Sequence, residues 1–238
     1  MNTSASVQPE ARVCFLTGAS KRLGASTARK FHAEGFNVII HFNNSRREAE
    51  ALVTQLNSLR EGSAQSLQAD LTDKQQLAPL ADQMLDCYQR LDVLINNASS
   101  FYPTPLQECS NEQWDDLVDS NLRAAFYLSQ QLAPELTRRA GSVVNMVDTH
   151  ADNPLKGFPI YSIAKAGVKA MTKSLAKELA PRVRVNGVSP GAILWPPSLE
   201  DESKPEVLLG RKKMLETIPL RVLGRSAEHC GHCFLFSE

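Results

Sequence analysis

The chain has 238 residues, of which 42% are hydrophobic and 22% are charged. That length suits one α/β domain, and the composition is that of an ordinary globular protein, which excludes a chain disordered throughout. Lys plus Arg and Asp plus Glu number 26 each, so no net charge draws the chain to nucleic acid or to an anionic membrane.

The N-terminal segment and the cysteines predict a cytoplasmic protein. No apolar run approaches the roughly 20 residues of a membrane span. The polar segment Met1–Ala11 is expected to be a loose tail, not a signal peptide. The five cysteines are scattered and odd in number, which favours free thiols in a reducing compartment over a disulfide framework. We therefore expect a flexible tail over 1–11 and a single domain over 12–238.

Short apolar runs alternate with longer helical patterns along the chain. The predicted strands are Val13–Thr17, Asn37–Phe42, Ala64–Ala69, Leu91–Ile95, Ser142–Val147 and Val183–Val188. The predicted helices are Leu23–Glu34, Arg46–Arg60, Asp73–Gln89 after a Thr72 N-cap, Asn111–Ala140 and Tyr161–Ala180. The strands lack polar alternation, so the pattern predicts one Rossmann-type, doubly wound parallel sheet with helices on both faces. The segment 194–220 departs from this rhythm, is rich in proline and charge, and is expected to form a substrate flap.

A glycine-containing loop follows the first predicted strand and opens the first helix. Such glycines let the backbone approach a pyrophosphate, and the helix N-terminus offers N–H groups and a positive dipole end. The predicted cofactor contacts in this loop are Gly18, Ser20, Lys21, Arg22, Leu23 and Gly24. The alternative is an ordinary strand-to-helix connection, because glycine-rich turns are common.

The residues after the second predicted strand bear on the choice between NAD and NADP. An NAD enzyme usually presents an acidic residue there, which binds the ribose 2′-hydroxyl. Here the first acid is Glu48, and it is preceded by His41, Phe42, Asn43, Asn44, Ser45, Arg46 and Arg47. A 2′-phosphate would find donors and cations in this stretch, so we expect NADPH with contacts from His41, Asn43, Asn44 and Ser45. Alternatively, Arg46 and Arg47 belong only to the solvated start of a helix.

Tyr161 and Lys165 lie four residues apart on one predicted helix, and therefore on one face. A nearby ammonium favours the phenolate form, so Lys165 is expected to lower the tyrosine pKa. Tyr161 would then act as a proton donor near neutral pH. The alternative, an ordinary amphipathic helix, fits poorly with the loop described above.

Together these residues resemble the short-chain dehydrogenase family over roughly Val13–Ser226. The loop is similar to the family's T-G-x3-G-x-G pattern, with Arg22 at its middle glycine, and Asn96-Asn97-Ala98-Ser99 is similar to N-N-A-G. The resemblance implies that Asp70 and Leu71 contact the adenine and that Asn121 links a water relay to Lys165. It further implies cofactor contacts from Asn97, Ala98, Ser99, Tyr161, Lys165, Pro190 and Gly191. For Asn121 the alternative is a helix-interior residue bonding locally.

One position departs from the broad family. Thirteen residues before Tyr161 the family carries serine, and this chain carries Asp148. A carboxylate would repel the developing charge of an alkoxide, whereas it suits a substrate with N–H groups. Pteridine reductases carry Asp here, so at this position the chain resembles that narrower group. Alternatively, Asp148 caps a turn before His150.

The segment from Asn97 to Leu106 resembles the pteridine reductase segment whose Phe stacks on a flat pterin. The resemblance makes Phe101 the stacking platform. The implied substrate contacts are Arg22, Ser99, Phe101, Asp148 and Tyr161. The alternative is that Phe101 and Tyr102 anchor the loop on the core.

The last predicted feature is the cluster His229-Cys230-Gly231-His232-Cys233. Its ligand types suit zinc, but its spacing is far tighter than ordinary zinc spacing, so we expect helix packing and no metal. The family continues with a last strand that this sequence lacks, so we expect a sheet without it. The resemblance implies a homo-oligomer, a tetramer.

The leading hypothesis is an NADPH-dependent enzyme that reduces a ring C=N bond of a pterin or folate. One alternative is a short-chain reductase acting on a carbonyl. An alternative of another class is an NADPH-binding sensor without catalysis.

Overall fold

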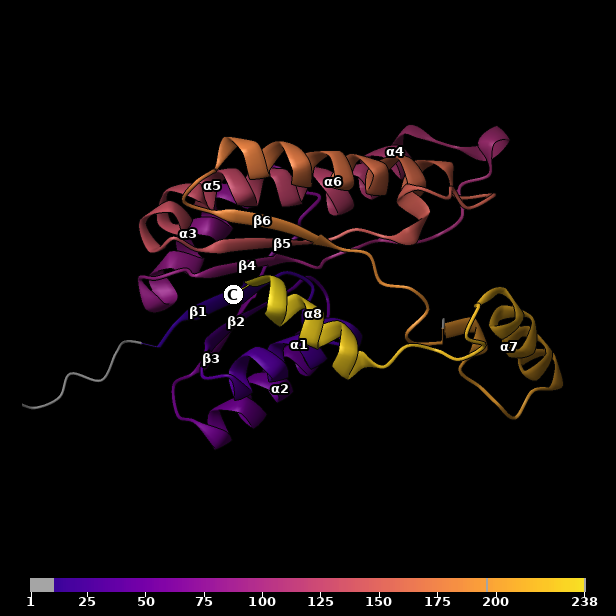
Figure 1. Ribbon diagram of the computed structural model, residues 1–238, viewed down its shortest axis with the longest axis horizontal. Coiled ribbons are helices and arrows are strands. Elements are labelled where there is room, and N and C mark those ends of the chain that lie inside the picture. The colour runs from indigo at the N-terminus through magenta and orange to yellow at the C-terminus, as the bar shows by residue number, and fades with distance from the viewer. Residues whose placement is uncertain (1–10, 196, 238) are drawn as a thin grey trace, which may run out of the picture.

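The computed structural model describes residues 11–195 and 197–237. Its sheet has six parallel strands in the order β3-β2-β1-β4-β5-β6, which confirms the predicted Rossmann-type fold (Figure 1). The strands are β1 (Val13–Leu16), β2 (Asn37–Phe42), β3 (Ala64–Gln68), β4 (Val93–Asn96), β5 (Ser142–Met146) and β6 (Arg184–Val188). The order reverses between β1 and β4, and ligands of such sheets bind beyond the carboxyl ends of the strands at that point.

Helices cover both faces of the sheet, which explains why the strands are apolar throughout. One core layer lies under α3 (Leu77–Tyr88), α5 (Ala124–Arg139) and α6 (Pro159–Glu178) and includes Phe15, Leu94 and Val143. The opposite layer lies under α1 (Arg22–Ala33) and α2 (Arg46–Leu59) and includes Leu16, Ile40 and Phe31. No helix among the described residues is long and apolar enough to cross a lipid bilayer.

Two predicted helix boundaries were wrong. The helix predicted from Asp73 begins at Leu77, because Asp70 accepts hydrogen bonds from the amide and hydroxyl of Thr72 and holds a turn there. The helix predicted over Asn111–Ala140 is α4 (Asn111–Val118) and α5, separated by a π-helical turn at Asp119–Arg123. Such turns insert one residue into a continuous apolar pattern, so helical spacing does not reveal them.

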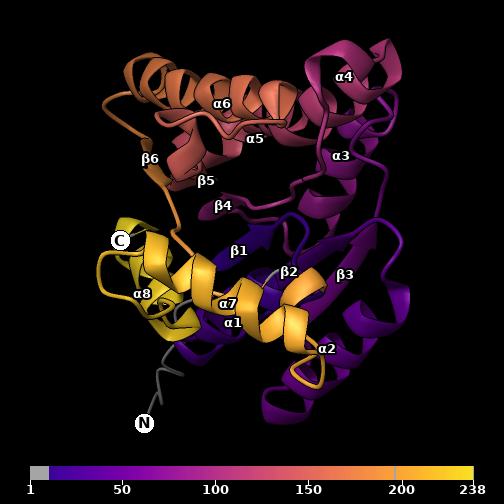
Figure 2. The ribbon, with the colours of Figure 1, turned by 90° about the vertical axis from the view of Figure 1, so that its right-hand side faces the viewer.

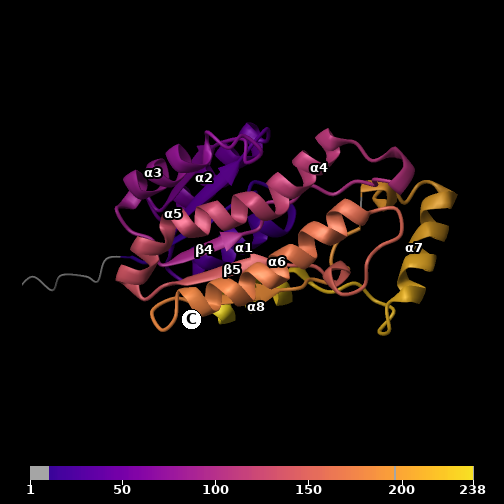
Figure 3. The same cartoon turned by 90° about the horizontal axis from the view of Figure 1, so that it is seen from above.

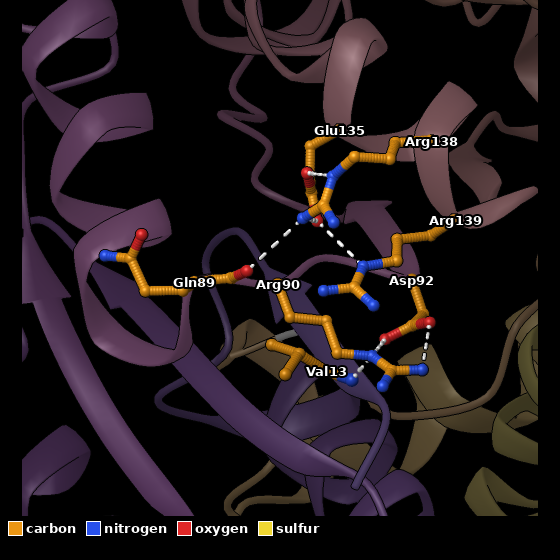
Figure 4. Close-up of polar contacts among 7 residues, drawn as sticks. All are labelled: Val13, Gln89, Arg90, Asp92, Glu135, Arg138 and Arg139. Atoms are coloured by element: carbon orange, nitrogen blue, oxygen red, sulfur yellow. Dashed lines mark hydrogen bonds and ion pairs between the residues drawn. The ribbon is translucent and has the colours of Figure 1, made fainter. Parts of the chain in front are cut away.

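Ion pairs lie near the amino ends of the strands, and Figure 4 shows them. Asp92 accepts two hydrogen bonds from Arg90, at 2.7 and 3.0 Å, and a third from the backbone amide of Val13 at 2.8 Å. Nearby, Glu135 binds both Arg138 and Arg139. Ion pairs and hydrogen bonds therefore stabilise the starts of β1 and β4, at the edge opposite the carboxyl ends.

The last third of the chain contributes two helices that lie apart. Within the expected flap, α7 (Pro205–Thr217) stands beyond the carboxyl ends of the strands, away from the layer of α5 and α6 (Figures 2 and 3). The chain then returns as α8 (Ser226–Ser237), which packs beside α1. The described residues contain no strand after β6. Of the expected N-terminal tail, residues 1–10 lie outside the described part of the chain.

Candidate active site

A cavity of about 610 Å³ opens at the carboxyl ends of β1, β2, β3 and β4. It is lined by every predicted cofactor contact of the loop and of the β2 and β3 ends. These are Gly18, Ser20, Lys21, Arg22, Leu23, Gly24, His41, Asn43, Asn44, Ser45, Asp70 and Leu71, joined by Asn97, Ala98 and Ser99. The cavity has the size of a nucleotide site, and the N-terminus of α1 opens into it.

The loop between β1 and α1 is held against the end of β4. Gly18 has a φ of +60°, and a Cβ there would lie 2.8 Å from the Cα of Ala98, so only glycine fits this approach. The side-chain amide of Asn97 donates to the backbone oxygens of Thr17 and Gly18 at 2.9 and 3.0 Å. The predicted contacts from two strand ends are therefore brought together.

The residues after β2 separate into two groups. Asn43, Asn44 and Ser45 line the cavity, whereas Arg46 and Arg47 do not. The side chain of Arg46 is exposed and pairs with Glu50, as in the alternative of a solvated helix start. Lys21 and Arg22 are the cations of the described lining, and the Nζ of Lys21 lies 2.8 Å from a carboxylate oxygen of Glu48. That ion pair lowers the pKa of Glu48.

A second cavity of about 270 Å³, which we call the catalytic cavity after the residues predicted to act there, adjoins the first. The two cavities share Arg22, Leu23, Asn97 and Ser99. The catalytic cavity is lined by the predicted catalytic residues Asp148, Tyr161 and Lys165 and by Pro190 and Gly191. The cavity expected to hold the nicotinamide therefore lies beside the cavity expected to hold the rest of the nucleotide.

The two carboxylate oxygens of Asp148 accept hydrogen bonds from two different donors. The Tyr161 hydroxyl donates to Oδ2 at 2.6 Å, and the backbone amide of His150 donates to Oδ1 at 2.8 Å. The cap before His150 is the turn that was predicted as the alternative for Asp148, whereas the hydrogen bond from the phenol was not predicted. The short contact makes Asp148 a direct proton partner of Tyr161.

The predicted effect on the Tyr161 pKa was wrong in direction. Burial raises the pKa of Tyr161, and the hydrogen bond and negative charge of Asp148 raise it further. Lys165 Nζ lies 5.7 Å from the centre of the phenol ring and donates to the backbone oxygen of Met146 at 3.0 Å. The phenol hydroxyl thus contacts the Asp148 carboxylate, whereas the Lys165 ammonium binds the backbone of Met146. Tyr161 therefore keeps its proton at neutral pH.

Lys165 is almost fully buried, with 2% of its surface exposed. Burial lowers its pKa to about 8, and the charge of Asp148 opposes part of that shift. The ammonium is therefore near its titration point in mildly alkaline solution.

Asn121 lies in the π-helical turn before α5, and its side chain binds the loop after β4. Its Oδ1 accepts from the Ser99 hydroxyl at 2.6 Å, and its Nδ2 donates to the backbone oxygen of Ser100 at 2.9 Å. A further bond goes to the Leu117 backbone oxygen, four residues back. The described contacts join Asn121 to the loop after β4, and its relay to Lys165 stays a prediction.

Phe101 lies between two aromatic rings. It stacks on Phe158 with centroids 4.7 Å apart and meets Tyr161 edge-on at 4.8 Å. Its side chain remains 53% exposed, so it is available as a platform beside the phenol. Phe158 was not predicted from the sequence, although its position three residues before Tyr161 at the helix start indicates the same face.

The flap is tied to the cofactor loop through Arg22. This residue has a φ of +52°, and its guanidinium donates to Glu200 Oε1 at 3.0 Å and to the Trp195 backbone oxygen at 3.1 Å. Arg211 in turn lies 4.6 Å from the centre of the Trp195 ring. Arg22 therefore reaches across both cavities to the flap, a contact that loop patterns do not reveal.

The His-Cys cluster lies in the middle of α8, where His229, Cys230 and Cys233 are buried and His232 is exposed. His229 and Cys233 are buried, and their ring nitrogen and sulfur are 3.7 Å apart. Cys230 contacts the hydroxyl of Thr27 on α1 at 3.4 Å. No group of three or more metal-ligating His, Cys, Asp or Glu side chains occurs among the described residues. His229 also lines the catalytic cavity, a position that the sequence pattern did not predict.

A cavity at the carboxyl ends of the strands that adjoins a buried phenol fits an oxidoreductase with a dinucleotide cofactor. The family model of the short chain dehydrogenase matches residues 12–206. The chain belongs to the short-chain dehydrogenase family, whose members use NAD(P)H.

Among curated proteins, the chain is similar to Pteridine reductase 1 of Leishmania tarentolae. The two are 34% identical over 267 aligned positions, which cover 96% of this chain and 90% of the relative. It is also 33% identical to the 3-oxoacyl-(acyl-carrier-protein) reductase FabG of Staphylococcus aureus, over 90% of this chain and 85% of the relative. The FabG of Thermotoga maritima is 34% identical, over 92% and 87%.

Proposed function

We propose that this chain reduces a ring C=N bond of pterins or dihydropterins, folates included, with NADPH. The observation that carries the proposal is the Asp148 carboxylate 2.6 Å from the Tyr161 hydroxyl, where the broad family has serine. A carboxylate at this point would oppose charge on a carbonyl oxygen, and it would accept N–H groups or relay a proton to a ring nitrogen.

NADPH supplies the hydride when bound, and the side chains of this chain bind, orient and protonate. Tyr161 holds the proton to be donated, and Asp148 binds the N–H edge of the pterin. Phe101 provides an aromatic face for the planar ring. Arg22 and Ser99 are polar contacts at its edge, and Lys165 binds the nicotinamide ribose.

NADPH is favoured over NADH by the lining of the larger cavity. Asn43, Asn44 and Ser45 present donors there, and Lys21 adds a cation. Glu48, the first acid after β2, is engaged by Lys21 and lies outside that lining. A 2′-phosphate beside Asn43, Asn44 and Ser45 would therefore meet donors, and the two carboxylates of the lining, Asp70 and Asp116, come from the end of β3 and from α4.

A carbonyl substrate is the second candidate, supported by the similarity to the two FabG proteins. The decisive assay follows NADPH oxidation by purified protein with dihydrobiopterin, dihydrofolate, simple ketones and a 3-oxoacyl thioester. Turnover of the pterins supports the proposal, and turnover of the carbonyls alone overturns it. NADPH binding without turnover of any compound would support the sensor alternative.

The substitution Asp148→Ser tests the substrate class directly. We expect kcat/KM for dihydropterin to fall by about 100-fold, the size of a lost acid–base partner. Carbonyl reduction should rise, because the hydroxyl polarises a carbonyl and does not repel alkoxide charge. The matched control is Asp152→Ser, which removes an exposed partner of Lys169. Equal losses for pterin and carbonyl would argue against an assignment by Asp148.

Phe101→Leu tests the stacking platform. We expect KM for dihydropterin to rise by up to about tenfold with a smaller change in kcat, since stacking contributes to binding of the planar ring. Simple ketones should be affected much less. Phe236→Leu on α8 is the control, since it removes a ring that is also partly exposed. A rise in KM common to pterins and ketones would indicate a general packing role.

We further propose a cytoplasmic homo-oligomer, a tetramer by resemblance to the family. All five cysteines are free thiols, as a reducing compartment requires. Sedimentation of the purified chain measures the assembly.

A further inference from the structure

His41 is a buried histidine at the carboxyl end of β2, with 2% of its surface exposed. Its ring lies between two other segments that line the cofactor cavity. The backbone amide of Gly18 donates to Nδ1 at 3.1 Å, and Nε2 lies 3.1 Å from the backbone oxygen of Ala69. Ala69 immediately precedes Asp70, one of the cavity residues after β3.

These two partners allow only one form of the ring. An amide N–H faces Nδ1, so that nitrogen must offer a lone pair, and a carbonyl oxygen faces Nε2, so that nitrogen must carry the proton. The neutral Nε2–H tautomer satisfies both, whereas the charged ring would turn an N–H toward the N–H of Gly18. Burial lowers the pKa of His41 to about 4, although the Ala69 bond and the Asp70 charge oppose the shift.

Both ring nitrogens are therefore engaged, which leaves the ring no free donor for the 2′-phosphate. The backbone oxygen of His41 also accepts from the Ala19 amide at 3.0 Å, so two consecutive loop amides are fixed by one residue. Gly18 is the loop residue with φ of +60°, and the bond from its amide to His41 helps to hold that conformation.

From this geometry we infer that His41 is a positioning residue for the nucleotide. Its single neutral tautomer ties the glycine loop after β1 to the adenine side after β3 and so sets the span of the cofactor cavity. This inference rests on the proposed use of NADPH, because the cavity is the proposed NADPH site.

Three substitutions separate the two bonds. In His41→Asn, the amide oxygen takes the place of Nδ1 as acceptor for Gly18; in His41→Gln, the amide nitrogen takes the place of Nε2 as donor to Ala69. His41→Leu removes both bonds. We expect the Kd for NADPH to stay within about threefold in the Asn variant and to rise about tenfold or more in the Leu variant, with the Gln variant between them. KM for NADPH should follow Kd while kcat stays nearly constant, because Tyr161 and Lys165 are untouched.

His32→Leu is the matched control. His32 is also buried, and its ring binds the Ser63 hydroxyl at 2.7 Å, away from the cofactor cavity. An equal loss of NADPH affinity in this variant, or NADPH binding by His41→Leu equal to that of the wild type, would overturn the inference.

An NMR measurement tests the tie without the cofactor. Nitrogen shifts of His41 should report the Nε2–H tautomer, and the Gly18 amide should exchange faster with solvent in His41→Leu than in the wild type. Equal exchange in the two proteins, or the opposite tautomer, would contradict the tie. A wild-type chain that binds no NADPH overturns the proposed function instead, and the tie is then decided by the Gly18 amide alone.

Discussion

Replacing Tyr161 with phenylalanine should abolish most turnover while cofactor binding stays intact. The hydroxyl is the only group removed, and it is the donor of the 2.6 Å hydrogen bond to Asp148 in the catalytic cavity. Proton transfer by a positioned side chain contributes about 100- to 10,000-fold, so we expect kcat to fall by at least about 100-fold. Stopped-flow measurement of NADPH oxidation gives kcat, and fluorescence titration gives the Kd for NADPH.

The control for this experiment is Tyr88→Phe. Tyr88 ends α3, and its hydroxyl donates to the backbone oxygen of Gly62 at 2.9 Å, outside both cavities. That variant should retain wild-type turnover. If Tyr161→Phe also turned over at the wild-type rate, another group would be the proton donor.

The sequence predicted which residues gather at the candidate cofactor cavity because parallel strands end at one edge. The apolar runs indicated where the strands end, so the polar residues after β1, β2, β3 and β4 were expected to lie together at that edge. The loop residues 18 and 20–24 and the residues 43–45 line one cavity. What the pattern did not reveal was which side chains are already engaged: His41 binds the loop, and Arg46 binds Glu50.

The catalytic side chains illustrate a different limit. Spacing on a helix placed Tyr161 and Lys165 on one face, and family position placed Asp148 with them, but the sign of the Tyr161 pKa shift depends on distance. Asp148 hydrogen bonds to the phenol, whereas the ammonium lies over the ring and binds Met146. Sequence separation carries no information on that competition between two charges.

The flap and α8 were least accessible to sequence reasoning. Pro205 at the first turn of α7 is a helix-start signal, but the surrounding charge masked it. The contacts of Arg22 with Glu200 and of Thr27 with Cys230 join residues 178 and 203 positions apart in the chain. Only the fold determines such contacts, because no local pattern encodes them.

Lys165 should give the reaction an alkaline limit. Its pKa is lowered to about 8 by burial, so the ammonium is present below that pH and is lost as the pH rises through it. Because we assign the charged form to binding the ribose, kcat/KM should fall with a single proton dependence above about pH 8. Lys165→Met should lower kcat/KM by about 100-fold and remove that dependence.

The same ionisation affects stability with a defined sign. An unfolded lysine titrates near its ordinary value of 10.5, whereas folded Lys165 titrates near 8. Between these values the unfolded chain binds more protons, so the free energy of unfolding should rise with pH there, and the cost of the buried charge should be complete below pH 8. Denaturant unfolding across this window, compared with Lys165→Met, measures the effect. Lys169→Met, four residues along α6 at an exposed ion pair with Asp152, should keep both the alkaline activity limit and the rise in stability. If Lys165→Met kept the alkaline limit, the titrating group would be another residue.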